Sequence, residues 1–248
     1  MTVAEASFRG VAHIVVDIEG TTSRSTYVYD VLFPYATGRF DDWLAAHADD
    51  PAVREIVDQA GAEIGVPDPT RDQVVRALTE WVAEDRKVTP LKTLQGLIWQ
   101  EGFDSGELVS DFYPDALDAL AAWHDSGLPM SVYSSGSILA QRNWYAHSPA
   151  GDLTPWISGY YDTANAGPKR EASSYAAIAA AIGADPATLL FCSDVVAELD
   201  AARDAGWQVV RVRRPGEPHA AEDSAYPEVA EMTAISVNPR SDEQARDT

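Results

Sequence analysis

Basic residues, cysteine and long apolar runs are all scarce in this chain of 248 residues. Lysine and arginine together number 18 against 39 aspartates and glutamates, which gives a formal net charge of −21. Nucleic acids and anionic membranes bind proteins through basic surfaces, so this balance excludes both as partners. The single cysteine, Cys192, permits neither an internal disulfide nor a cysteine-based zinc cluster. No apolar run approaches the roughly 20 residues that span a bilayer.

The same scarcity indicates a compartment and a class of protein. A lone cysteine is typical of reducing compartments, and Met1 to Gly10 lacks the apolar core of a secretory signal. We therefore expect a cytoplasmic protein. Because 46% of the residues are apolar and 9% are aromatic, the chain has enough material for a packed core and is not of the disordered class.

Short apolar runs, each ending in polar residues, recur along the chain and alternate with helical patterns. A run of this length that lacks polar alternation is typical of a buried strand in a parallel sheet. The strands are expected at Ala12 to Asp17, Met130 to Tyr133, Leu189 to Cys192 and Trp207 to Val212, and the helices at Pro114 to Trp123, Ile138 to about His147, Arg170 to Gly183 and Val195 to Gly206. Strands alternating with helices predict an α/β fold with a doubly wound parallel sheet of the Rossmann-like type.

The pattern changes between Ser25 and about Val109, where helical signals recur and no clear strand is seen. Thr70 and Gln73 form a capping-box pattern that opens one amphipathic helix, and a second helix is expected near Leu91 to Trp99. The sequence therefore predicts an α/β core made of residues 1–25 and 110–248, with a helical domain, residues 26–109, inserted into it. The polar segment Ser241 to Thr248 is expected to be disordered.

Polar residues follow the expected strands, where ligands bind in open α/β sheets. They are Asp17, Glu19, Ser134, Ser135 and Asp194. Asp17 and Asp194 follow different strands and could converge on one hard cation, since Mg²⁺ is usually held by one or two carboxylates with waters and substrate phosphate. For Asp194 or Ser135 alone, an ordinary helix cap is the simpler interpretation. Asp17 and Glu19 at the end of a buried strand favour a cation partner, because burying unpaired carboxylates is unfavourable.

Lys169 is a candidate for binding an anion. It is one of three lysines in the chain, with Lys87 and Lys92, and it follows Gly167-Pro168 at the start of an expected helix, where backbone amides also favour negative charge. The alternative is an ordinary solvated lysine, which the sequence alone favours until something connects Lys169 to the acids.

Other kinds of site lack their sequence patterns. The chain has no Walker loop, no Gly-x-Gly-x-x-Gly dinucleotide turn and no Gly-x-Ser-x-Gly nucleophile elbow. Its five histidines are scattered without the spacing of metal ligands. The residues at the strand ends are what remains.

The order of these motifs resembles that of the haloacid dehalogenase-like phosphohydrolases and, within them, of the enolase-phosphatases or acireductone synthases. Glu19 is the most telling position, because general phosphatases of that superfamily usually carry aspartate there. The matching segments, which span about Ala12 to Pro218, are Val16 to Thr22, Val31 to Ala36, Leu94 to Trp99, Tyr133 to Ser137, Gly167 to Glu171 and Ser193 to Ala202. The match thus includes the helical insertion as well as the core.

The resemblance implies a haloacid dehalogenase-like core with residues 26–109 as a helical cap, one Mg²⁺ per subunit and a monomer. It implies conversion of 2,3-diketo-5-methylthiopentyl-1-phosphate, a small phosphorylated diketone, into an acireductone and phosphate in methionine salvage. Enolisation would precede hydrolysis through an aspartyl-phosphate. The implied roles are nucleophile for Asp17, general acid or base for Glu19, metal binding for Asp17, Asp194 and the Glu19 carbonyl, and phosphoryl binding for Ser134, Ser135 and Lys169.

Some alternatives remain open at this stage. One is a general phosphomonoesterase of the same superfamily that acts without enolisation, and another is a non-catalytic acidic interaction protein. The enolisation base is not identified by the sequence. Phe33, Leu94 and Trp99 could line an apolar pocket for the methylthio tail, although such residues more often pack helix against helix.

Overall fold

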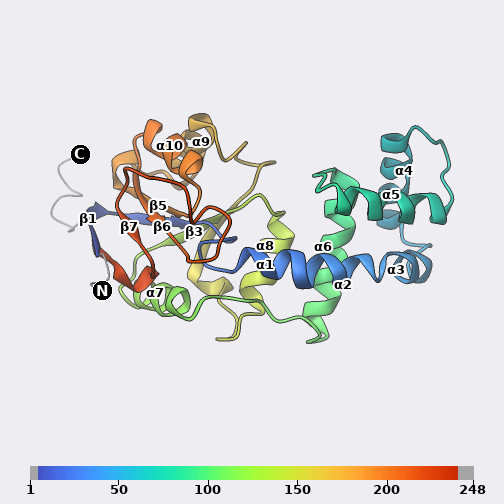
Figure 1. Ribbon diagram of the computed structural model, residues 1–248, viewed down its shortest axis with the longest axis horizontal. Helices are drawn as coiled ribbons and strands as arrows, with labels where there is room; N and C mark the ends of the chain where they lie inside the picture. Colours follow the sequence, from blue (N-terminus) through green and yellow to red (C-terminus); the bar gives the residue numbers. More distant parts are fainter. Residues whose placement is uncertain (1–4, 240–248) are drawn as a thin grey trace. The chain divides into compact units, whose positions relative to one another are not determined.

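The computed structural model describes residues 5–239 and divides the chain into two compact units (Figure 1). One unit contains the chain up to Ser25 and from Ser110 onward, and the other is Thr26–Val109. The prediction made for Ser241 to Thr248 lies outside the described residues. No helix of the described chain is long and apolar enough to cross a membrane.

A six-stranded sheet, in which every neighbouring pair is parallel, forms the centre of the first unit. Its spatial order is β4-β3-β2-β5-β6-β7. The strands are β2 (His13–Val16), β3 (Met130–Tyr133), β4 (Ile157–Tyr161), β5 (Leu189–Ser193), β6 (Gln208–Val212) and β7 (Glu228–Val229). In addition, β1 (Ala6–Val11) and β8 (Ile235–Pro239) pair in parallel as a separate two-stranded sheet.

Helices flank both sides of the central sheet, with α9 and α10 on the side opposite α7 (Figure 1). Val15 of β2, Phe191 of β5 and Val209 of β6 share a buried cluster with Ile178 of α9 and Leu199 of α10. The helices are α7 (Pro114–Asp125), α8 (Ile138–Ala146), α9 (Ala172–Ile182) and α10 (Val196–Asp204), with short 3₁₀ turns at η2 (Thr154–Trp156), η3 (Pro186–Thr188) and η4 (Met232–Ala234). The predicted α/β fold with a doubly wound parallel sheet is confirmed.

The sequence did not predict the strands at the margins of the sheets. Strand β4 lies at one end of the central sheet, and its sequence Ile-Ser-Gly-Tyr-Tyr interrupts the apolar run that marks a buried strand. Strand β1 alternates, with Ala6 and Phe8 buried and Ser7 and Arg9 exposed. Strand β1 is half-buried, and its period-2 alternation differs from the continuous apolar run of a fully buried strand, whereas β4 buries Ile157 and Tyr160, three residues apart, and shows neither pattern.

The second unit is helical, and no strand occurs within residues 26–109, all of which are described. Thr70 makes the predicted capping box with Gln73 at the start of α5, and the helix expected near Leu91 extends further in both directions as α6. The elements are α1 (Ser25–Tyr27), the π-helix η1 (Val28–Leu32), α2 (Phe33–Thr37), α3 (Phe40–Ala46), α4 (Pro51–Ile64), α5 (Arg71–Ala83) and α6 (Thr89–Asp104).

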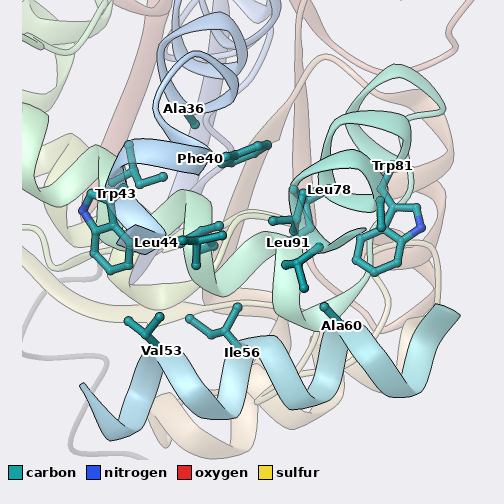
Figure 2. Close-up of a cluster of buried hydrophobic side chains, with 14 residues drawn as sticks. Ala36, Phe40, Trp43, Leu44, Val53, Ile56, Ala60, Leu78, Trp81 and Leu91 are labelled. Atoms are coloured by element: carbon teal, nitrogen blue, oxygen red, sulfur yellow. The ribbon is translucent and has the colours of Figure 1, made fainter. Parts of the chain in front are cut away.

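The helical unit has its own hydrophobic core. Figure 2 shows Val53, Ile56 and Ala60 along one face of α4, pointing toward Leu44 and Leu91. Spacings of three and four residues put these α4 side chains on one stripe. Leu94 is fully buried in the same cluster, which favours packing over pocket lining for that residue.

Candidate active site

The site begins where three neighbouring strands end. Asp17 directly follows β2, which lies between β3 and β5, and its backbone N–H donates to the carbonyl oxygen of Cys192 at 3.0 Å. Val16 pairs with Val132 of β3 on one side and with Cys192 of β5 on the other. This register brings Asp17, Ser134 and Asp194 to the same edge of the sheet.

Lys169 contacts the acids directly. Its Nζ lies 2.6 Å from Oδ1 of Asp17 and 2.7 Å from Oε2 of Glu198, and all three side chains are buried. The solvated-lysine alternative is therefore wrong. The expected helix start also needs correction, because α9 begins at Ala172 and Lys169 lies in the turn before it.

Three hydrogen bonds to backbone carbonyls hold that turn. The Tyr133 hydroxyl donates to the carbonyl oxygen of Gly167, Ser174 Oγ donates to that of Pro168, and the Tyr175 hydroxyl donates to that of Lys169, each at 2.8 Å. The Lys169 side chain is thus aimed at Asp17 by residues of β3 and α9.

The electrostatics of the site favour an added cation. Burial raises the pKa of the Asp17 carboxyl to about 6, although Lys169 acts in the opposite direction. Burial and the nearby Asp17 raise the pKa of Asp194 to about 7. Burial alone would lower the pKa of the Lys169 ammonium, but the Asp17 and Glu198 carboxylates raise it overall. One lysine therefore faces more buried negative charge than it can neutralise, as expected of a site that takes up a cation.

Asp194 packs tightly against the loop that follows Asp17. A Cβ atom built on Gly20, whose φ is +75°, would lie 2.4 Å from Oδ2 of Asp194. Thr21 Oγ1 accepts a hydrogen bond from the Asp194 N–H at 3.0 Å and donates to Oδ1 of Asp194 at 3.4 Å. The position of the Asp194 carboxylate is therefore set by the Thr21 hydroxyl and by the close approach of the Gly20 backbone.

The two predicted serines differ in their surroundings. Ser134 is buried, and its Oγ accepts from the Gly136 N–H at 3.2 Å. Ser135 is exposed at the same edge of the sheet. Gln141 of α8 braces this loop, because its Nε2 donates to the carbonyl oxygens of Gly136 and Tyr161, each at 2.9 Å.

Glu19 is half-buried, and its backbone forms a bridge with Ser23. Within residues 5–239, no set of three or more His, Cys, Asp or Glu side chains is grouped so as to hold a metal ion. A ligand set made of two carboxylates and a backbone oxygen does not require such a group. This is compatible with the expected use of the Glu19 carbonyl.

Sequence reasoning missed two residues of this site. Glu198 bonds Lys169 and accepts from Ser193 Oγ at 3.0 Å. Its place in the first turn of α10, soon after the end of β5, is the signal that could have indicated it. Gln141, which holds the Ser134 loop, carries no comparable signal, because a glutamine within a helix is ordinarily exposed.

The haloacid dehalogenase-like hydrolase family model matches residues 11–206. Over 83% of this chain and 86% of the relative, the sequence is 55% identical to enolase-phosphatase E1 of Streptomyces avermitilis. The chain belongs to the enolase-phosphatase family of the haloacid dehalogenase-like hydrolases. Another member, from Pseudomonas aeruginosa, is 51% identical over 82% of this chain and 90% of its own length.

Two solved structures share the fold of this chain. The crystal structure of the UTR4 protein of Saccharomyces cerevisiae has a TM-score of 0.76 and 31% identity, covering 90% of this chain and 98% of that chain. The structure of CbbY from Rhodobacter sphaeroides in complex with xylulose-(1,5)bisphosphate has a TM-score of 0.55 at 15% identity, covering 92% of this chain and 97% of that chain, a likeness of fold alone.

Proposed function

We propose that this enolase-phosphatase family member converts 2,3-diketo-5-methylthiopentyl-1-phosphate into the acireductone 1,2-dihydroxy-3-keto-5-methylthiopentene and phosphate, in methionine salvage. The observation that carries the proposal is the buried Asp17–Lys169–Glu198 cluster in a chain that is about half identical to enolase-phosphatases along most of its length. The protein would thus be a magnesium-dependent phosphoric monoester hydrolase.

The donor atoms suit Mg²⁺. Asp17 and Asp194 supply buried carboxylate oxygens, and burial raises the pKa of both carboxyl groups. A divalent cation would stabilise the two carboxylates in their charged form. We assign metal binding to these two side chains and to the Glu19 carbonyl. When bound, Mg²⁺ would neutralise phosphate charge and polarise the neighbouring carbonyl.

Asp17 is the nucleophile in the phosphatase step. Its carboxylate oxygen forms a bond to phosphorus as the bond from phosphorus to the substrate C1 oxygen breaks, which yields an aspartyl-phosphate and a leaving oxygen that takes a proton. Water then attacks this phosphorus, releasing phosphate and regenerating the carboxylate. Lys169 and the Ser134-Ser135 loop bind the phosphoryl oxygens as charge develops on them.

Glu19 is the general acid or base of the site. In the enolisation step, a proton leaves the carbon beside a carbonyl and the carbonyl oxygen takes one up. We assign to Glu19 assistance of this proton transfer, in addition to protonation of the leaving oxygen. A Glu19→Ala protein that enolises the diketone at the parent rate would remove Glu19 from the enolisation step.

We assign binding of the methylthio tail to the helical unit, residues 26–109. Phe33 and Trp99 support this role, because their rings are stacked at 6.2 Å, both are only partly buried, and the Trp99 indole N–H donates to the carbonyl oxygen of Leu32 at 2.8 Å. An apolar thioether is well matched to aromatic rings.

We also propose that the protein is cytoplasmic and monomeric. Sedimentation of the purified protein at several concentrations would test whether it is a monomer.

Magnesium-dependent phosphate release from the diketone phosphate, with Asp17→Asn as control, tests the function. We expect release by the parent and at least ~10³-fold slower release by Asp17→Asn, because no carboxylate remains to attack phosphorus. Fast release with no enol detected would instead indicate the general phosphomonoesterase. A parent protein that releases phosphate from no small phosphate ester would contradict the proposal that it is an enzyme.

A further inference from the structure

Arg214, which lies shortly after β6, is almost entirely buried, at 3% exposure. Its Nη1 donates to both carboxylate oxygens of Asp115, at 2.8 and 2.7 Å, and to the carbonyl oxygen of Ala230 at 3.0 Å. The Tyr113 ring lies 4.1 Å from the guanidinium carbon. This guanidinium is held in one orientation, and its charge is paired with Asp115.

The other edge of the Arg214 guanidinium holds the catalytic loop. Nε and Nη2 both donate to the carbonyl oxygen of Thr21, at 3.1 and 3.0 Å. Thr21 is fully buried and lies four residues after Asp17. Two donors converging on one buried carbonyl fix that peptide more firmly than a single hydrogen bond does.

Thr21 passes this constraint to Asp194. Its hydroxyl accepts from the Asp194 N–H and also donates to the Asp194 carboxylate. On the same loop, a Cβ at Gly20 would collide with that carboxylate. A continuous set of hydrogen bonds therefore runs from Asp115 through Arg214 and Thr21 to Asp194.

We propose that Arg214 is a positioning residue of the hydrolase site, which fixes the Asp194 carboxylate beside Asp17 by holding the Thr21 carbonyl. Arg214 acts through geometry rather than charge, because Asp115 neutralises its guanidinium. Lysine cannot replace it, since an ammonium group lacks the planar fork that bonds Asp115 on one edge and Thr21 on the other. This inference rests on the proposed function, because it assigns the Asp17–Asp194 pair to metal binding.

Binding of Mn²⁺ to the metal-free protein, followed by the electron paramagnetic resonance of free Mn²⁺, tests the inference without any substrate. We expect about tenfold weaker Mn²⁺ binding for Arg214→Lys and for Thr21→Val, the range seen when residues behind metal ligands are replaced. Both variants interrupt the same chain of hydrogen bonds from Arg214 to Asp194. The double variant should therefore bind Mn²⁺ only slightly more weakly than the weaker-binding single variant. The rate of p-nitrophenyl phosphate hydrolysis at limiting Mn²⁺ should fall in each variant together with its Mn²⁺ affinity.

Arg213→Lys is the matched control. Arg213 precedes Arg214 but is exposed and bonds the carbonyl oxygen of Ala220 and the Glu228 carboxylate, so we expect parental Mn²⁺ affinity. Parental Mn²⁺ affinity in folded Arg214→Lys, even with a lowered melting temperature, would overturn the inference, as would losses that multiply in the double variant.

Thr21→Val decides the matter if Arg214→Lys does not fold, since that variant deletes only the hydroxyl link to Asp194. Parental Mn²⁺ affinity in Thr21→Val then overturns the inference. A parent that binds no Mn²⁺ overturns it together with the metal site. A parent that binds Mn²⁺ but leaves the diketone phosphate unchanged overturns the proposed function alone.

Discussion

At the scale of single residues, the site depends on charges that are buried together. Lys169 lies within 2.7 Å of two carboxylates, Asp17 and Glu198, and each of the three would be strongly destabilising if buried alone. Removing one member of such a cluster leaves the others unpaired. Substitutions here should therefore change both chemistry and stability.

Replacing Lys169 by methionine should weaken the binding of phosphate. Methionine keeps the apolar length of the side chain but leaves Asp17 and Glu198 facing each other without a cation. We expect the concentration of inorganic phosphate that half-inhibits hydrolysis to rise at least about tenfold, since a charge-assisted contact contributes about 1.5–3 kcal/mol. Lys92→Met is the control, because Lys92 lies in the helical unit. Equal inhibition of Lys169→Met and the parent would contradict the assignment.

Gly20→Ala should inactivate the protein through Asp194. The new methyl group would meet Oδ2 of Asp194 at 2.4 Å, and a shift of the carboxylate by about 1 Å can slow catalysis ~10²-fold. Gly10→Ala is a matched control, because Gly10 has a similar φ of +68° but nothing within 4 Å of the added Cβ. Both variants should lose about 1 kcal/mol of stability from the strained backbone. Comparable activities of the two variants would show that the contact with Asp194 is unimportant.

At the scale of helices and strands, the sequence was most informative for strands buried on both faces and for helices with a clear start or stop residue. The strands β2, β3, β5 and β6 and the helix α7 are close to their predicted bounds, because continuous apolar runs and a flanking proline or glycine mark them. The half-buried β1 and β4 were missed. The alternation of β1 is short and β4 has no regular alternation, and both strands are stabilised by pairing with residues distant in sequence.

The candidate site, like the fold, was predictable only where its residues follow strands that are evident in the sequence. Asp17 and Asp194 could be found because they end strands that are evident in the sequence. Lys169 could not be connected to them, because its position depends on Tyr133 and Tyr175, which hold its turn. Arg214 shows the same limit, since its importance arises from a contact with Thr21 across 193 positions of the chain.

His13 should make the stability of the β2–β3 pair depend on pH. His13 is buried, its Nε2 lies 2.8 Å from Ser131 Oγ, and burial lowers its pKa from 6.5 to about 4. The unfolded chain therefore binds a proton between pH 6.5 and 4 that the folded protein does not. Stability falls as pH is lowered through this window, with a contribution from His13 of at most about 3 kcal/mol.

Urea unfolding of His13→Gln at pH 7 and pH 4.5 tests this pH dependence. Because glutamine does not titrate, the variant should lose less unfolding free energy between these two values than the parent does. His124→Gln, at an exposed position of α7, should behave like the parent. If His13→Gln and the parent lose the same amount, His13 is not the group responsible.

At the scale of the whole molecule, the net charge of −21 opposes the approach of an anionic phosphate ester. The local field of the site must be inverted by Lys169 and a bound cation, whereas the long-range field remains negative. Long-range repulsion extends about 30 Å at 0.01 M salt and about 8 Å at 0.15 M. The two ranges of interaction should therefore respond differently to salt.

Raising the ionic strength from about 0.01 M to about 0.15 M should increase kcat/KM for the phosphate substrate, because salt screens the repulsive field more than the buried site. Saturating Mg²⁺ is held constant, and sucrose of equal osmolality serves as the control for effects other than screening. A steady fall in kcat/KM over this range would show that attraction, not repulsion, governs the encounter.

The most direct test of the central assignment follows two signals in one reaction of the parent protein with 2,3-diketo-5-methylthiopentyl-1-phosphate and Mg²⁺. The absorbance of the enol and the release of phosphate are recorded together. An enolase-phosphatase should form the enol species first and release phosphate from it afterwards. Phosphate released without a preceding enol, or no phosphate at all, would contradict the account.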